Sequence, residues 1–381
     1  FSTNDEVNDL SFYSYELINR SSSTVFDTYI GLHIDGDLGY AGDDYIGCDV
    51  TRGLGYYYNG DEVDGDGQVF AYGANPPAIG FDIYEGPYQD ANGIDDCSSY
   101  DDQKNLLCDE CALNGSVNGS NFGDEIVDNE RWGMTNFMAF MNFGGTGQMP
   151  VDSEIYLYLR SLWKDGQHLT YGGFGHPQAG GTGPLCSFMF PGLSDPCGWG
   201  QKGVIMPDWN ERQGWKDPSD RRTIQSSGPF TMEPGEVNTF TFGVVWARSY
   251  DGGLLASVDK MMMVDDKAQA LFDNCFRIID GPDAPELTIR EEDQKLTFYI
   301  WNSPMSNNYL ESYNQKDPAI ICPSSSEDCD KNYAFQGYQV WQLIDQNVSM
   351  NEVYNGNSSK ARLVFQCDLR DGISDIVNFE W

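Results

Sequence analysis

The sequence predicts a mainly β protein, in which an antiparallel β-sandwich with long acidic loops and one amphipathic helix is followed by a second, smaller β-sandwich. Two observations lead to this fold class. Runs in which apolar and polar residues alternate recur along the chain, and clusters of Gly, Asn, Asp and Pro separate them. A single segment has helical spacing instead.

The alternating runs are the predicted strands, because successive side chains of a strand point to opposite faces. Residues 24–34 place five apolar or β-branched side chains on one face: Phe26, Thr28, Ile30, Leu32 and Ile34. Runs of the same kind occupy residues 239–247, 285–289, 295–301, 337–343 and 361–369. Short strands separated by long turn-rich segments are typical of a sandwich.

The predicted helix covers residues 254–276, where apolar residues recur every three or four positions. Its methionines are read as packing residues, since Met fills irregular gaps in a core. Two prolines follow in Asp280–Pro285 and end regular structure. We therefore predict a first domain over residues 1–280 and a second, incomplete one over residues 284–381.

Charge excludes several classes of partner. The 381 residues carry 59 acidic and 22 basic side chains, for a net charge of −37. A polyanion such as nucleic acid would be repelled, and so would an anionic membrane surface. No run of 18 apolar residues occurs, so membrane insertion is not expected. Because the chain begins at Phe1 inside a strand-like pattern, we expect a piece of a longer secreted precursor.

Ten cysteines in an acidic, Gly- and Asn-rich chain indicate disulfides formed in an oxidising compartment. We predict Cys186–Cys197 and Cys322–Cys329, since each pair closes a short loop containing proline. Cys108 and Cys111 have the spacing of zinc ligands, but a second pair of this kind is missing and the chain has three histidines.

Acidic residues gather in loops that suit calcium. Between Asp35 and Glu130 there are 22 acidic residues against two basic ones, in short groups spaced by Gly and Asn. Calcium takes six to eight oxygen ligands, which such loops can direct at one point. None completes an EF-hand, and solvated turns that use Asp for turn geometry are the alternative. The candidate ligands are Asp35, Asp37, Asp43, Asp44, Asp49, Asp61, Asp64, Asp66, Asp90, Asn92, Asp95, Asp96, Asp124 and Asp128.

Catalytic motifs are missing from the sequence. It has no Gly-x-Ser-x-Gly, P-loop or HExxH motif, so we predict neither catalytic nor cofactor-binding residues. A glycosidase remains an alternative, because Glu130, Glu154 and Glu211 lie near aromatic residues in the sequence. Two further segments are candidate contact surfaces. One is the Gly-rich stretch between His168 and Gly181, and the other is residues 199–215, whose tryptophans would be exposed.

Long strings spread over the chain resemble large secreted proteins of Bacteroidota that the type IX secretion system exports. They are Tyr15–Ser22, Asp35–Gly39, Asp43–Asp49, Gly55–Asp61, Gly73–Gly80, Asn121–Arg131, Asp220–Arg222, Ser227–Phe230, Val244–Arg248 and Asp265–Phe276. The unit from Pro285, with Gly337–Trp341, is similar to a fibronectin type III module. The resemblance implies export and a location outside the cell or on the outer-membrane surface.

Together these features predict a non-enzymatic structural or adhesion module, rigidified by calcium and disulfides within a larger cargo protein. Its partners would be other surface or extracellular proteins, including further copies of itself. The alternative is a glycan-binding module or a glycoside hydrolase acting on extracellular polysaccharide.

Overall fold

The computed structural model describes residues 9–65, 67–96, 99–100, 106–107, 118–141, 147, 151–213, 217–276, 281–317, 320, 330–345, 348, 353 and 360–369. The chain divides into two compact units, Phe1–Asp273 and Asn274–Trp381, beside the Pro- and Gly-containing stretch that the sequence marks. With 40% strand, 14% helix and antiparallel sheets, the predicted mainly β class is confirmed.

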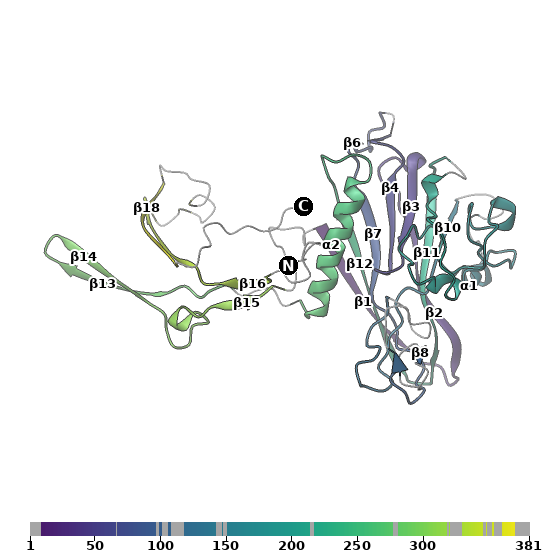
Figure 1. The fold of residues 1–381 in the computed structure, drawn as a ribbon, viewed down its shortest axis with the longest axis horizontal. Coiled ribbons are helices and arrows are strands. Elements are labelled where there is room, and N and C mark those ends of the chain that lie inside the picture. The colour runs from purple at the N-terminus through teal and green to yellow at the C-terminus, as the bar shows by residue number, and fades with distance from the viewer. Residues whose placement is uncertain are drawn as a thin grey trace. The chain divides into compact units, whose positions relative to one another are not determined.

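The first unit contains a larger sheet of five strands, all antiparallel to their neighbours (Figure 1). Its order is β1 (Leu10–Ile18), β12 (Val237–Ala247), β7 (Ala78–Glu85), β4 (Leu54–Asn59) and β3 (Asp44–Asp49). β1 is thus an edge strand, and it pairs with a strand from the other end of the unit, Leu10 opposite Val245.

The smaller sheet of this unit has the order β10 (Asn136–Met141), β11 (Arg221–Met232) and β2 (Val25–Asp35). Two short pairs join β5 (Val63–Asp64) to β6 (Gly73–Ala74) and β8 (Ser99–Tyr100) to β9 (Leu106–Leu107). Single turns of 3₁₀-helix occur at Ala41–Asp43, Pro177–Ala179, Trp199–Gln201 and Glu211–Gln213, and in the second unit at Tyr309–Glu311.

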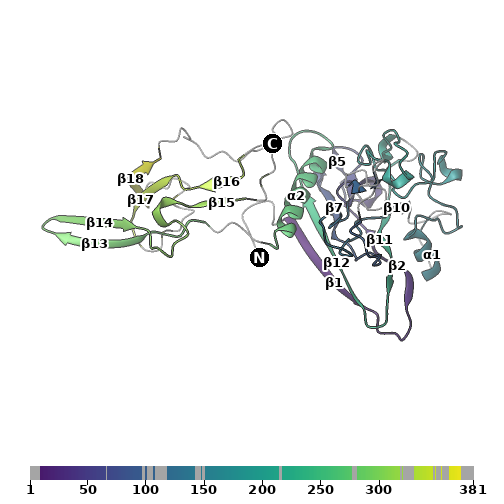
Figure 2. The same cartoon turned by 60° about the horizontal axis from the view of Figure 1, so that its bottom comes forward.

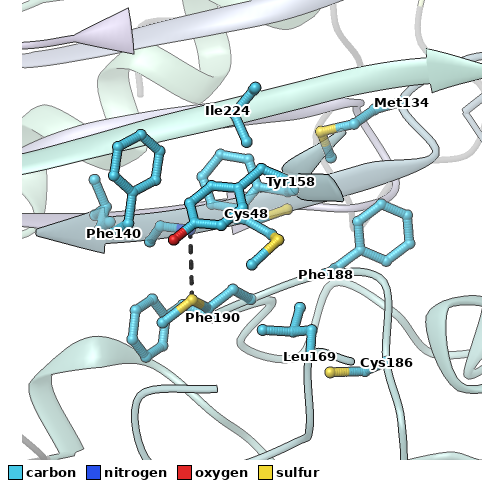
Figure 3. Packing of buried hydrophobic residues seen from close by; sticks show 14 of the residues in the cluster. Cys48, Met134, Phe140, Tyr158, Leu169, Cys186, Phe188, Phe190 and Ile224 are labelled. Carbon is cyan, nitrogen blue, oxygen red and sulfur yellow. Dashed lines mark hydrogen bonds between the residues drawn. The ribbon is translucent and has the colours of Figure 1, made fainter. Parts of the chain in front are cut away.

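A core shared by both sheets lies between them. The Tyr57 hydroxyl of β4 is 3.1 Å from the Ile34 carbonyl of β2 and 3.1 Å from Thr223 Oγ1 of β11. Beside Tyr57, a Cβ at Gly55 would lie 2.4 Å from the Phe137 ring of β10, so only glycine allows this approach. Figure 3 shows other members of the same buried cluster, among them Phe140 and Tyr158.

Helix α2 (Ala256–Asp273) covers the other face of the five-stranded sheet (Figure 2). Met261 and Val264 of α2 pack against Leu54 and Val245, which alternate with the core-facing residues of their strands. The helix expected over residues 254–276 is therefore confirmed, with its methionine in a packing role. Helix α1 (Asp152–Tyr158) was not predicted, because its 7 residues are too few to show a helical periodicity.

Strand β2 departs from the predicted alternation at its start. Phe26, expected on the core face, is 69% exposed. The pairing of β2 with β11 shifts register between Ser227 and Phe230, and Asp27 has a φ of +49°. Such an irregularity changes the face to which the residues before it point.

The described part of the second unit consists of three two-stranded antiparallel pairs. They join β13 (Glu286–Glu292) to β14 (Lys295–Trp301), β15 (Asn314–Lys316) to β16 (Asn332–Ala334), and β17 (Gly337–Leu343) to β18 (Ala361–Asp368). The expected runs at 285–289, 295–301, 337–343 and 361–369 all fall on strands. A fibronectin type III arrangement of these strands stays a prediction.

The predicted Cys186–Cys197 bond is wrong. Cys186 is a free thiol in the core with Leu169 and Phe188, and burial raises its pKa (Figure 3). No disulfide joins two of the described cysteines, although Cys197 itself is disulfide-bonded. Cys48 is likewise a buried free thiol, whereas two further free thiols, Cys275 and Cys367, are exposed. Cys322 and Cys329 lie outside the described residues.

No helix in the described ranges is both long enough and apolar enough to cross a bilayer.

Candidate functional site

Three carboxylates converge where β2 ends and β11 begins. One oxygen from each of Asp35, Asp37 and Asp220 lies within 4.8 Å of the others. Arg222, opposite Asp35 in the sheet register, donates to Asp35 Oδ2 at 2.9 Å. Burial, together with the charges of Asp35 and Asp220, raises the pKa of Asp37. The sequence had indicated Asp35 and Asp37 but not Asp220, which is distant along the chain.

A second acidic group borders the first and organises the loops around β3. Asp44 Oδ2 accepts the Leu38 amide at 3.1 Å, and Asp64 Oδ1 accepts the Tyr40 amide at 2.9 Å. Asp43 Oδ2 accepts the Gly65 amide at 2.8 Å. These carboxylates fix the path of residues 38–65 through backbone donors, which is the role that the turn-geometry alternative assigns to them.

Three oxygens of this second group are buried and lack a hydrogen-bond donor: Asp43 Oδ1, Asp44 Oδ1 and Asn59 Oδ1. Asp44 and Asn59 lie opposite each other on β3 and β4, and they are 2% and 1% exposed. Burial is the main cause that raises the pKa of Asp44 to about 8, with further contributions from Asp43, Asp64 and Asp37. Asp37 therefore links the two groups electrostatically.

The remaining predicted calcium ligands near β3 form an ion pair, accept a turn amide or lie outside the described residues. Asp49 is 5% exposed and forms an ion pair with Arg52 at 2.7 Å. Asp61 is exposed and accepts the Val63 amide at 2.8 Å. Asp66 is not among the described residues.

The acidic stretches 90–96 and 121–130 interlock through hydrogen bonds. Asp95 accepts the amides of Gly123 and Glu125, while Asp128 accepts those of Asn92 and Gly93. The other predicted members also have donors: Asn92 Nδ2 for Asp96, Ile126 and Asn129 for Asp124, and Thr231 for Asp90. In the structure these exposed carboxylates accept hydrogen bonds within and between the turns, and their role as calcium ligands stays a prediction.

His176 and Trp209, two of the histidine and tryptophan candidates, are buried packing residues. His176, 4% exposed, lies 3.0 Å through Nε2 from Asp165 Oδ2 and accepts the Gln178 amide through Nδ1. Trp209, predicted to be exposed, is buried, because its ring packs against Phe190 and Tyr171. Trp199 is half-buried against the core, and Trp215 lies outside the described residues.

Glu211, a candidate glycosidase carboxylate, is part of a buried ion pair. Its Oε1 accepts Arg221 Nε at 2.6 Å, and its Oε2 accepts the Ile46 amide at 2.9 Å. The side chains of Glu211 and Arg221 are 2% and 0% exposed. Such a carboxylate holds β3 to β11 and is not open to a substrate.

Comparison with family models, with curated proteins and with solved structures finds no match to this chain.

Proposed function

We propose that the chain is a non-enzymatic module of a secreted surface protein, and that calcium binding at the acidic end of β2, β3 and β11 rigidifies it. The observation that carries the proposal is Asp44, a buried carboxylate with one oxygen that has no donor. Asn59, its neighbour across the strand pair, also has a buried side-chain oxygen without a donor, and the charge of Asp37 acts on Asp44. A divalent cation would supply what these oxygens lack.

The ligands of the proposed ion come from segments far apart in the sequence. Asp35 ends β2 and Asp37 follows it, Asp44 begins β3, and Asp220 precedes β11. Asp35, Asp37 and Asp220 each bring one oxygen within 4.8 Å of the others, so these three would ligate the ion, and Asp44 would act beside them through its charge. Such an ion would join the end of β2 to the start of β11, as a structural role requires. Export through the type IX system and partners on the cell surface belong to the same proposal. Their support is the resemblance and the acidic composition.

Calcium should therefore raise the melting temperature of the full chain. At a calcium concentration of 100 times the dissociation constant, one site adds about 2.7 kcal/mol to the free energy of unfolding. For a unit of this size, the melting temperature would rise by about 5–10 °C. Scanning calorimetry with calcium and with a chelator measures the difference. Asp37→Asn and Asp44→Asn should reduce it, whereas Asp251→Asn, in an exposed loop, should not. Equal melting in both buffers would contradict the proposal.

A further inference from the structure

A cavity of about 570 Å³ lies between the outer face of the five-stranded sheet and the second half of α2. Its size is that of a small-molecule site. The lining comes from the β3–β4 turn, β7, residues 118–131 and α2. The lining residues used below are Asp82 and Tyr84 of β7, Arg52 and Arg131, and Asp265 and Phe272 of α2.

Two carboxyl groups interrupt an otherwise apolar interface here. Asp82 and Asp265 are each 1% exposed, while Val258, Met261 and Val264 of the same helix pack on the sheet. Tyr84 donates to Asp265 Oδ1 at 3.0 Å, but Asp82 Oδ1 has no hydrogen-bond partner. Burial raises the pKa of both carboxyls, with a further contribution from the charge of Asp265 at Asp82 and from that of Asp266 at Asp265. A buried polar atom without a partner is costly for folding, so the Asp82 oxygen points to a ligand.

The two arginines of the cavity wall form ion pairs with other carboxylates. Arg52 pairs with Asp49 and Asp266, each at 2.7 Å. Arg131 lies 3.4 Å from Glu85 and stacks over the Tyr88 ring. Arg52 acts on Asp82 and Asp265 only through its charge, and no ion pair within the described ranges joins either arginine to these two carboxyls.

A ligand that contacts Asp82 and Asp265 is better matched by an organic cation than by a metal ion. Among the described residues, neither Asp82 nor Asp265 belongs to a set of three closely spaced metal-ligating side chains. The cavity is also far larger than one ion requires, and two aromatic rings, Tyr84 and Phe272, stack in its wall 5.8 Å apart. Aromatic rings beside carboxylates suit an ammonium group that carries an alkyl chain.

We propose that this cavity binds a small organic ammonium ion, with Asp82 and Asp265 as its counter-ions and Tyr84 and Phe272 against its alkyl part. The site is separate from the acidic end of β2, β3 and β11, so either proposal can fail without the other. Binding favours the ionised carboxyls, so protons are released to solvent as the cation enters.

Calorimetric titration of the full chain with n-butylammonium tests the site. We expect saturable binding whose heat changes with the ionisation enthalpy of the buffer, because protons are released. Asp82→Asn and Asp265→Asn should each weaken binding by at least about thirtyfold, the effect of removing one partner of a buried charge pair. Asparagine at position 265 still offers an acceptor to Tyr84. Asp259→Asn, an exposed site on the same helix, removes the same charge and should bind as the wild type does.

Three parallel titrations separate the alternatives. 1-Butanol has the same alkyl chain without the charge, glucose represents a neutral glycan, and Ca²⁺ represents a metal. The proposal is overturned if n-butylammonium does not saturate, or if 1-butanol or glucose binds equally well. It is also overturned if both Asn variants, folded by circular dichroism, bind as the wild type does, or if only Ca²⁺ shows binding that depends on Asp82.

Discussion

Replacing Glu211 by alanine should destabilise the first unit by about 3–5 kcal/mol, because it leaves a fully buried guanidinium without its counter-ion. Arg221 would keep only the Asp217 carbonyl at 2.8 Å and its position over the Phe174 ring. The Ile46 amide of β3 would lose its acceptor as well, which adds to the cost. Urea denaturation of the variant and the wild type measures the free energy of unfolding.

Two control variants separate charge from packing at this pair. Glu211→Gln keeps acceptor and shape but removes the charge, so it should be milder than alanine. The double variant Glu211→Leu/Arg221→Met removes both charges and should recover much of the loss, as replacement of buried ion pairs by apolar residues does elsewhere. If the free energy of unfolding of the alanine variant lies within about 1 kcal/mol of the wild-type value, the ion pair is not required for stability.

In the absence of calcium, the stability of the first unit should fall as the pH rises from about 4 to about 8. Asp44 has a pKa of about 8 in the folded chain, against an ordinary value of 3.8. Between these values the folded state binds more protons than the unfolded one, so raising the pH favours unfolding. The shift corresponds to at most roughly 6 kcal/mol for Asp44. Asp82 and Asp265 act in the same direction.

Melting curves at pH 5, 6, 7 and 8 in a chelator test this dependence. Asp44→Asn should flatten it, since asparagine does not ionise. Saturating calcium should also flatten it, because an ion stabilises the ionised carboxylate in the folded state. A melting temperature that rises from pH 5 to pH 8 in the chelator, with the Asn variant unchanged in slope, would refute the assignment.

Some strands, among them β12 and β14, and helix α2 could be predicted because their apolar periodicity is long and undisturbed. The runs at 239–247 and 295–301 coincide with β12 and β14 to within two residues. Phe26 could not be placed, since the irregular pairing of β2 with β11 depends on a strand about 200 residues away. The prediction of a Cys186–Cys197 bond failed for a similar reason. The core around Cys186 assembles from distant segments, and loop length alone does not reveal it.

The acidic site was only partly predictable. Loop composition identified Asp35, Asp37 and Asp44, whereas Asp220 joins them through the pairing of β11 with β2. The sequence carries one signal for the cavity. Asp265 lies on the same helical stripe as Met261 and Ala268, where an acidic residue breaks the apolar pattern. Its partner Asp82 had no such signal, because strand alternation does not show which face meets a helix.

The pairing of β1 with β12 sets the order in which the chain can be built. Leu10 meets Val245, so the five-stranded sheet cannot close until the second of these strands has been made. At 5–20 residues per second, synthesis leaves β1 without its partner for roughly 10–50 s. During that time its aromatic residues, including Tyr13 and Tyr15, are available to other chains. Pairing over such a sequence distance is also slow to form. The longer the first strand stays without its partner, the greater the chance that its unpaired edge associates with another chain.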